Sequence, residues 1–306
     1  MDLNQLLITS LVSLKSKRLV TSLELRARNI EINISRAISL NVYFGRAHFL
    51  YISYNNSNDQ NAALPADITL PVAASFQYKG TKIQSSTPLF SISNWLNHIR
   101  SVFCHTKPLD VRFHQDCERF EVQSLKNMIG NVDVLYVAEE VTDAYTKEVL
   151  KHFNARIELS LYRNPFDETC EIQKFFIQNY KRIAFWGVYS LDDMLLFNGK
   201  KVRFINPISP KQFNQFIKHW IRGSNPRLQT MFLMTHNSNF LSREVLLKGI
   251  HCVDVAKEVK LKIHQKHRLV SDSLVQIRRK DGTPAVIVTD NLVLLNVLYV
   301  RFIVLH

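Results

Sequence analysis

Apolar and polar residues are patterned along this chain in a way that predicts alternating helices and strands. Residues 3–23 carry a helical stripe of leucines at positions 3, 6, 7, 11, 14 and 19. Residues 29–54 are rich in β-branched and aromatic residues with partial alternation, which predicts two or three strands. Residues 76–83 predict a hairpin that turns at their Lys-Gly pair, and residues 91–103 have apolar side chains at helical spacing.

Six short apolar segments follow and predict strands near residues 111, 134, 157, 183, 202 and 230. They are about 19–28 residues apart, and the chain between them carries apolar residues at helical spacing. The clearest of these helices is predicted over residues 209–222, where Ser209 and Gln212 form a capping-box pattern around Pro210. The Gly-Ser-Asn-Pro sequence at residues 223–226 predicts where this helix ends.

A strand followed by a helix every 20 to 28 residues matches the period of leucine-rich-repeat-like stacks, in which neighbouring units bury each other's apolar faces. The Leu/Asn ladder of regular repeats is absent. We therefore predict a mixed α/β (α+β) protein with an irregular strand–helix stack and a β-rich N-terminal part. The Asp281-Gly282 pair between alternating segments predicts a terminal β-hairpin that caps the stack. A compact α/β sheet is the alternative architecture.

The composition favours a folded, basic protein. The 306 residues are 46% hydrophobic, and the formal net charge is +13. Such a charge makes nucleic acid a candidate partner. The lysines and arginines are spread along the chain rather than clustered, however, which favours a solvated basic surface. The four cysteines have no CxxC spacing and no signal peptide precedes them, so we expect reduced thiols in the cytoplasm or nucleus.

Candidate chemistry is sparse. The sequence has no phosphate loop, HExxH or GxSxG motif, so we predict that the protein is not an enzyme and binds no cofactor. Cys104, His105, His114 and Cys117 are zinc-ligand types, but their spacing is not that of a zinc finger. The pattern favours two buried thiols and two surface histidines over a metal site.

Three segments resemble nematode F-box proteins of the F-box-associated type 2 group. The first and most specific is residues 218–228, KHWIRGSNPRL. Residues 277–287 resemble the terminal hairpin of that group, and residues 16–23 resemble the end of its F-box. The motif residues carried by the first segment are Trp220, Gly223, Ser224, Asn225, Pro226 and Leu228.

The resemblance implies a non-catalytic substrate receptor. In that family the F-box docks on the Skp adaptor of a cullin-based (SCF-type) ubiquitin ligase, and the associated domain binds the protein to be ubiquitylated. Residues 1–23 amount to about half of an F-box, so adaptor docking does not follow from them alone. The residues of this segment that could contact the adaptor are Leu6, Leu7 and Leu11. The alternatives are a nucleic-acid-associated protein, which the lack of recognition motifs disfavours, and a stand-alone protein-binding scaffold without a ubiquitin role.

The resemblance and the apolar pattern together divide the chain into four segments. We expect an F-box remnant over residues 1–25, a β-rich segment over 26–90, the F-box-associated stack over 91–290 and an apolar tail over 291–306. The tail is too short to span a bilayer and predicts a buried strand instead. The polar tract at residues 55–61 predicts a loop. Stacks of this kind offer extended surfaces, so we expect the partner on the strand or loop side.

Overall fold

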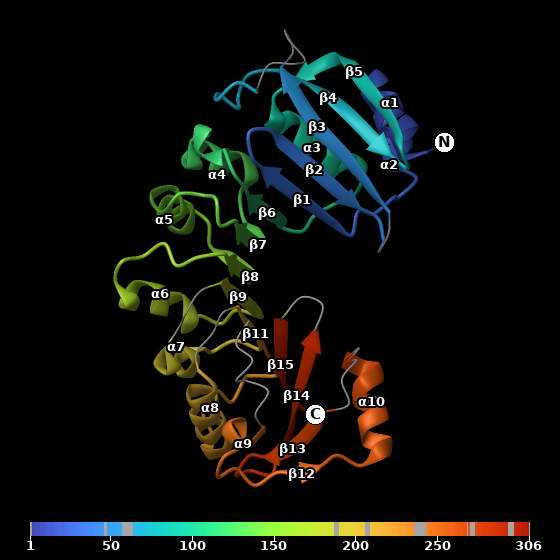
Figure 1. Cartoon of the computed structure of the whole chain (residues 1–306). Coiled ribbons are helices and arrows are strands. Elements are labelled where there is room, and N and C mark those ends of the chain that lie inside the picture. The colour runs from blue at the N-terminus through green and yellow to red at the C-terminus, as the bar shows by residue number, and fades with distance from the viewer. Residues whose placement is uncertain are drawn as a thin grey trace. The chain divides into compact units, whose positions relative to one another are not determined.

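The fold is taken from a computed structural model of the chain (Figure 1). It describes residues 2–45, 48–56, 64–186, 190–205, 209–235, 243–267, 269, 273–292 and 297–305. The chain forms two compact units, residues 1–156 (unit 1) and 157–306 (unit 2). The expected division into four segments stays a prediction about the sequence. No helix among the described residues is both long and apolar enough to cross a membrane.

Unit 1 is a mixed sheet covered by helices. Its helices are α1 (Leu3–Val12), α2 (Leu14–Thr21), α3 (Ile92–Val102), α4 (Val122–Ile129) and α5 (Asp143–His152), with a short 3-10 turn at Cys117–Arg119. Its strands are β1 (Asn29–Ile34), β2 (Ile38–Tyr43), β3 (Phe49–Asn56), β4 (Val72–Tyr78), β5 (Thr81–Phe90), β6 (Leu109–Phe113) and β7 (Val132–Val137). The strand order is β5-β4-β3-β2-β1-β6-β7. Strands β1 to β5 pair antiparallel in sequence order, and β6 joins β1 in parallel.

Local chemistry explains these elements. In β1 the three isoleucines alternate with polar residues and are buried, which fixes the face that β1 turns to the helices. The predicted hairpin at residues 76–83 is confirmed: Lys79 and Gly80 turn between β4 and β5 with φ of 48° and 83°. Two positive φ values in succession are the signature of a type I′ turn, whose twist matches antiparallel strands. Of the polar tract 55–61, the first two residues end β3 and the rest lie outside the described residues.

Unit 2 contains the strand–helix stack. Its strands are β8 (Ala155–Leu161, which begins at the boundary), β9 (Arg182–Trp186), β10 (Lys201–Ile205), β11 (Thr230–Thr235), β12 (Val253–Asp254), β13 (Leu274–Arg278), β14 (Pro284–Leu292) and β15 (Val297–Val304). Its helices are α6 (Thr169–Phe176), α7 (Leu191–Leu196), α8 (Pro210–Arg222), α9 (Arg243–Leu246) and α10 (Lys257–His267). Strands β8 to β11 pair in parallel, each followed by a helix. Figure 1 shows α6, α7 and α8 along one side of these strands. The mixed α/β class predicted from the sequence is therefore confirmed.

The end of the stack differs from expectation. The predicted Asp281-Gly282 hairpin exists as β13 and β14, but it does not pair with the last parallel strand. Strand β15, formed by the apolar tail, lies between β11 and β14 and is antiparallel to both. Its Val300, Phe302 and Ile303 are almost fully buried. A strand this apolar needs neighbours on both edges, which explains why it is inserted rather than placed at the rim.

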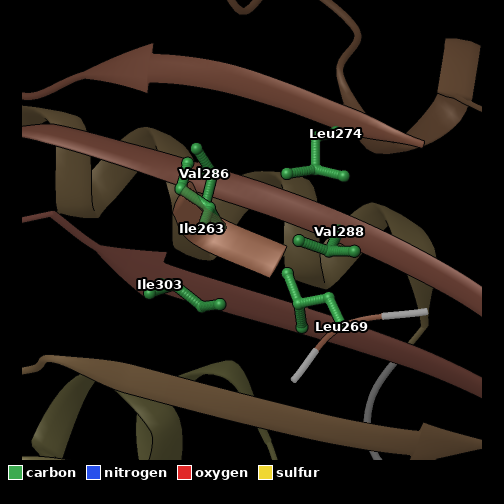
Figure 2. Close-up of a cluster of buried hydrophobic side chains, with 6 residues drawn as sticks. All are labelled: Ile263, Leu269, Leu274, Val286, Val288 and Ile303. Atoms are coloured by element: carbon green, nitrogen blue, oxygen red, sulfur yellow. The ribbon is translucent and has the colours of Figure 1, made fainter. Parts of the chain in front are cut away.

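Helix α10 was not expected from the sequence. It packs on the strands at the C-terminal end of unit 2, on the side opposite α8 in Figure 1. Figure 2 shows the small core that holds it, in which Ile263 meets side chains from the three neighbouring strands. The members of this core are Ile263, Leu269, Leu274, Val286, Val288 and Ile303. Lysines and histidines make up most of this helix, so the sequence has no broad apolar stripe from which the helix could be predicted.

Candidate protein-interaction surface

The family motif ends helix α8. Gly223 adopts φ of 116°, and its N–H and that of Ser224 donate to carbonyls of the last helical turn, those of Trp220 (2.9 Å) and His219 (3.1 Å). A glycine is suited to this left-handed position because it has no Cβ. Trp220 and Leu228 lie in the core, at 0% and 2% exposure. The motif therefore fixes where α8 stops.

Asn225 ties that end to the neighbouring helix. Its side-chain amide donates to the carbonyls of Met194 (3.1 Å), Leu195 (3.2 Å) and Phe197 (2.8 Å) at the end of α7. The residue is buried and has φ of 49°, a conformation that asparagine tolerates better than most residues. Pro226 is exposed. These contacts give most of the motif a structural role, since it supplies buried caps rather than a surface for a partner.

The N-terminal leucines lie mostly inside the fold. Leu6 and Leu7 are 8% and 0% exposed, and Leu11 is half-buried. Adaptor contact through these residues stays a prediction. The exposed apolar side chains of this region are others, namely Val12, Leu14, Leu19 and Leu23 at 75%, 77%, 65% and 53%. The expected leucine stripe put Leu14 and Leu19 on one face with Leu6 and Leu7, but Ser13 ends α1 and caps α2, so the stripe is divided between two helices.

The zinc-ligand types do not converge in the described structure. Within the described ranges, no three His, Cys, Asp or Glu side chains are placed to hold a metal ion. Cys117 is buried, and Cys104 is half-buried. His105, expected at the surface, is only 4% exposed because it directly follows the turn that ends α3. Burial, together with the charges of the nearby Arg100 and Lys107, lowers the pKa of His105 to about 4, so its ring is neutral at pH 7.

The face of the unit 2 sheet opposite α6, α7 and α8 is called the open face below. Side chains alternate along each strand, so the helix contacts on one face identify the other. Phe302 of β15 meets Trp220 of α8 with ring centroids 4.9 Å apart, and Phe204 of β10 meets Phe176 of α6 at 6.2 Å. The next residues toward the N-terminus, Arg301 and Arg203, therefore lie on the open face.

Three open-face side chains form a row across β10, β11 and β15. Arg203 pairs in register with Phe232, and Phe232 pairs with Arg301. The guanidinium carbon of Arg203 lies 5.0 Å from the centre of the Phe232 ring, and that of Arg301 lies 5.5 Å from it. Both distances are typical of cation–π contacts. We call Arg203, Phe232 and Arg301 the basic-aromatic row.

The row is short of negative charge. Among the described residues, no carboxylate lies within ion-pair distance of Arg203 or Arg301. Arg301 donates one long bond, 3.5 Å, to the carbonyl of His267, and its buried Nε has no hydrogen-bond partner among the residues that the structure describes. Burial lowers the pKa of His267, and the charges of Lys266, Lys201 and Arg301 lower it further. The open face next to α10 is thus strongly positive.

Further aromatic rings and one ion pair continue the open face. Tyr162 and Trp186 stack at 3.7 Å with an angle of 13° between their planes, and Tyr299 lies 5.1 Å from Phe232. Arg182 of β9 is paired at 2.8 Å with Glu158 of β8. Cations with aromatic rings are enriched at recognition surfaces, whereas paired charges contribute less.

The charge of the chain is concentrated in unit 2. Unit 2 has 22 Lys and Arg against 12 Asp and Glu, a net charge of +10, whereas unit 1 has 17 against 14, a net charge of +3.

A second basic surface of unit 2 is a hollow of about 510 Å³ beside the end of α8. Its titratable lining is basic, with no carboxylate: Lys218, Arg222, His251, Arg278 and Lys280. Lys218 and Arg222 lie near the helix C-terminus, where cations suit the helix dipole, so this hollow has a structural explanation.

The helix-free face of unit 1 is polar but internally paired. Arg112 of β6 lies 5.1 Å from the ring centre of Tyr136 and 2.7 Å from a carboxylate oxygen of Glu31. Asn41 donates to the same carboxylate at 3.0 Å. Asn29 donates to Asp110 at 2.5 Å. This face satisfies its own charges.

Comparison with known proteins bears on what these surfaces do. Residues 171–233 match the family described as F-box associated. The chain is 24% identical over 292 residues to the F-box associated domain-containing protein sdz-33 of Caenorhabditis elegans, which covers 94% of this chain and 87% of that protein. No solved structure matches the chain. The match runs from within α6 to within β11, and it contains the motif and two residues of the basic-aromatic row, Arg203 and Phe232. The resemblance of this chain to nematode F-box-associated proteins is therefore confirmed.

Proposed function

We propose that this protein is a non-catalytic protein-recognition module whose partner binds the open face of unit 2. The observation that carries the proposal is the basic-aromatic row, because its two cations and one ring lie outside the core and have no carboxylate partner in the described structure. Surfaces rich in arginine and aromatic rings are where protein interfaces concentrate their binding energy.

The finer proposal is that the module is the substrate-recognition subunit of a cullin-based ubiquitin ligase. F-box-associated domains are the part of such receptors that holds the substrate, which supports this assignment. Adaptor docking would use the apolar side chains that α1 and α2 expose, since Leu14 and Leu19 are accessible whereas Leu6 and Leu7 pack inside. Exposed apolar groups gathered on one region are typical of docking surfaces.

A pull-down with purified Skp-type adaptor tests the ligase role. We expect the chain to retain adaptor, and Leu14→Asp/Leu19→Asp to abolish retention, because two buried carboxylates would oppose docking. The matched control, Lys15→Gln, changes an exposed residue of the same helix and should keep binding. If only a version extended by a complete F-box retains adaptor, the ubiquitin role is withdrawn while the recognition role stands.

Site-directed photo-crosslinking tests the partner surface. A crosslinking amino acid at Lys201, on the open face, should capture the partner in extracts of the source organism. The same group at Lys211, exposed on α8, should not. Equal capture from both positions, or capture from Lys211 alone, would contradict the choice of the open face.

A further inference from the structure

We propose that the basic-aromatic row binds an extended acidic peptide segment of the partner, through carboxylates at alternate positions that pair with Arg203 and Arg301. This inference rests on the proposed function, because it names the chemistry of the partner at the same open face. It goes further in stating which side chains discriminate and what they select.

The row requires a negative charge. Two guanidinium groups approach one ring at 5.0 and 5.5 Å, so they repel each other across Phe232. Within the described part of the chain no carboxylate offsets that repulsion, and the buried Nε of Arg301 lacks an acceptor. A carboxylate from outside would offset the repulsion between the two guanidinium groups, since guanidinium and carboxylate form paired, charge-assisted hydrogen bonds.

A peptide carboxylate fits this face better than a nucleic acid does. Single-stranded nucleic acids bind by stacking bases on free aromatic rings. Here the ring of Phe232 is already contacted by two guanidinium groups and by Tyr299, and Trp186 is stacked on Tyr162. The rings therefore hold the arginines in place, and the arginines are the groups that remain to bind a ligand.

The spacing of the two arginines defines the motif. Strand β11 separates β10 from β15, so the Cα atoms of Arg203 and Arg301 are about two strand spacings, roughly 9.5 Å, apart. Side chains on one side of an extended peptide repeat every ~6.8 Å, and the long arginine side chains span the difference. Acidic residues two positions apart, as in Glu-X-Glu, match this separation, whereas adjacent acids would point to opposite sides.

Fluorescence anisotropy on the full chain tests the inference. The probes are a labelled peptide of alternating Glu and Ala, the same peptide with Gln in place of Glu, and a single-stranded oligouridine. We expect the Glu peptide to bind at least about tenfold more tightly than the Gln peptide, with affinity falling as salt rises. Arg203→Gln/Arg301→Gln should weaken it by at least about tenfold, because two charge-assisted bonds are lost.

Two further variants make the test decisive. Arg222→Gln/Lys280→Gln removes the same charge from the basic hollow beside α8 and should change the affinity less than about twofold. Arg203→Lys/Arg301→Lys keeps the charge but removes the planar fork, and we expect a loss of about threefold. The lysine variant also keeps the test open if the glutamine variant fails to fold, which thermal unfolding would reveal.

The outcomes separate the inference from the function on which it rests. Equal affinity for the Glu and Gln peptides, an equal loss in the hollow variant, or tighter binding of oligouridine would each overturn the acidic-peptide inference. The recognition role would survive such a result if crosslinking from Lys201 still captures a protein partner. Failure of that crosslinking with intact Glu-peptide binding would instead sink the proposed function.

Discussion

Both units place an arginine over an aromatic ring on one face of the sheet, but the charge of that arginine is treated in opposite ways. In unit 1, Arg112 lies over Tyr136 and is held by Glu31 at 2.7 Å. In unit 2, Arg203 lies over Phe232, and the same ring is contacted by a second arginine, Arg301.

The difference separates a structural contact from a binding surface. An ion pair whose carboxylate is only 10% exposed is satisfied within the chain, so it holds strands together and offers little to a partner. Two cations without a carboxylate partner among the described side chains repel each other, and a bound anion would offset that repulsion. The net charges of +3 and +10 follow the same division. Four substitutions test this difference between the units.

The largest effect is expected at Asn225, which supports unit 2 alone. Asn225→Ala removes three hydrogen bonds to the end of α7, two of them buried and one part-buried, and should lower the free energy of unfolding by about 2–3 kcal/mol. Urea unfolding measures this loss. Asn225→Gly keeps the left-handed backbone and isolates the amide contribution, and Pro226→Ala, at an exposed position, should change stability by less than about 0.5 kcal/mol. Hydrogen exchange that accelerates equally in unit 1 would contradict a role confined to unit 2.

Glu31→Gln would make the unit 1 face resemble that of unit 2. It leaves Arg112 without its carboxylate, and we expect a loss of about 1–3 kcal/mol, since Arg112 itself is 38% exposed and partly solvated. The variant should also bind the Glu peptide about twofold more tightly than the native chain does. Glu24→Gln is the control, because its carboxylate is 73% exposed and lies 3.5 Å from Arg26. Unchanged peptide binding would mean that unpaired charge alone does not create the surface.

The pH dependence of unit 1 reports on Asp110. Burial raises the pKa of Asp110 to about 6, although the hydrogen bond from Asn29 opposes the rise. A carboxyl whose folded pKa lies above its unfolded value of about 3.9 costs stability when it ionises, and this cost is complete above the folded pKa. Asp110→Asn should therefore stabilise the chain by about 1–2 kcal/mol at pH 7, allowing for solvent screening.

The difference in free energy of unfolding between Asp110→Asn and the native chain should narrow as pH falls from 6 to about 4. At the lower pH the carboxyl of Asp110 becomes protonated in both the folded and the unfolded native chain. Urea unfolding of both proteins across this range measures the gap. The neutral His98 and His105, whose pKa values burial lowers to about 4, titrate in both proteins and cancel in the difference. A gap that does not vary with pH would show that Asp110 stays ionised at low cost.

Phe232→Leu should have the smallest effect. It removes two cation–π contacts of about 0.5 kcal/mol each at a partly exposed site, so we expect a loss of about 1 kcal/mol. Affinity for the Glu peptide should fall about threefold, because the two guanidinium groups lose their support. Met234 lies nearby on the same face of β11, so Met234→Leu is the matched control. It should leave both the free energy of unfolding and the affinity for the Glu peptide unchanged. An equal loss in both variants would show that the ring plays no special part.

The sequence predicted individual elements well. The capping residues Ser209 and Gln212 mark the start of α8, and their capping box is present. The alternation in β10 places Val202 and Phe204 inside and Lys201 and Arg203 outside, which a reader of the sequence can anticipate. These features depend on residues a few positions apart, so local chemistry determines them.

The basic-aromatic row could not be predicted in the same way. It depends on the parallel register between β10 and β11 and on the insertion of β15 beside β11. Pairing partners are chosen by global packing, and the apolar tail gave no signal of which strand it would join. Helix α10 escaped prediction because its burial rests on one isoleucine, Ile263. The sequence alone does not indicate that Arg203, Phe232 and Arg301 lie next to one another in the sheet.

The position of β15 has a consequence for how the protein is made. It is the final strand in chain order, yet it carries one of the two arginines of the row and covers the edge of β11. A ribosome releases this segment after all the other strands, and non-local pairing of this kind is slow. A nascent chain therefore exposes the edge of β11, and the basic-aromatic row is incomplete, until β15 has emerged and paired. Chaperones would be expected to attend the interval before β15 docks.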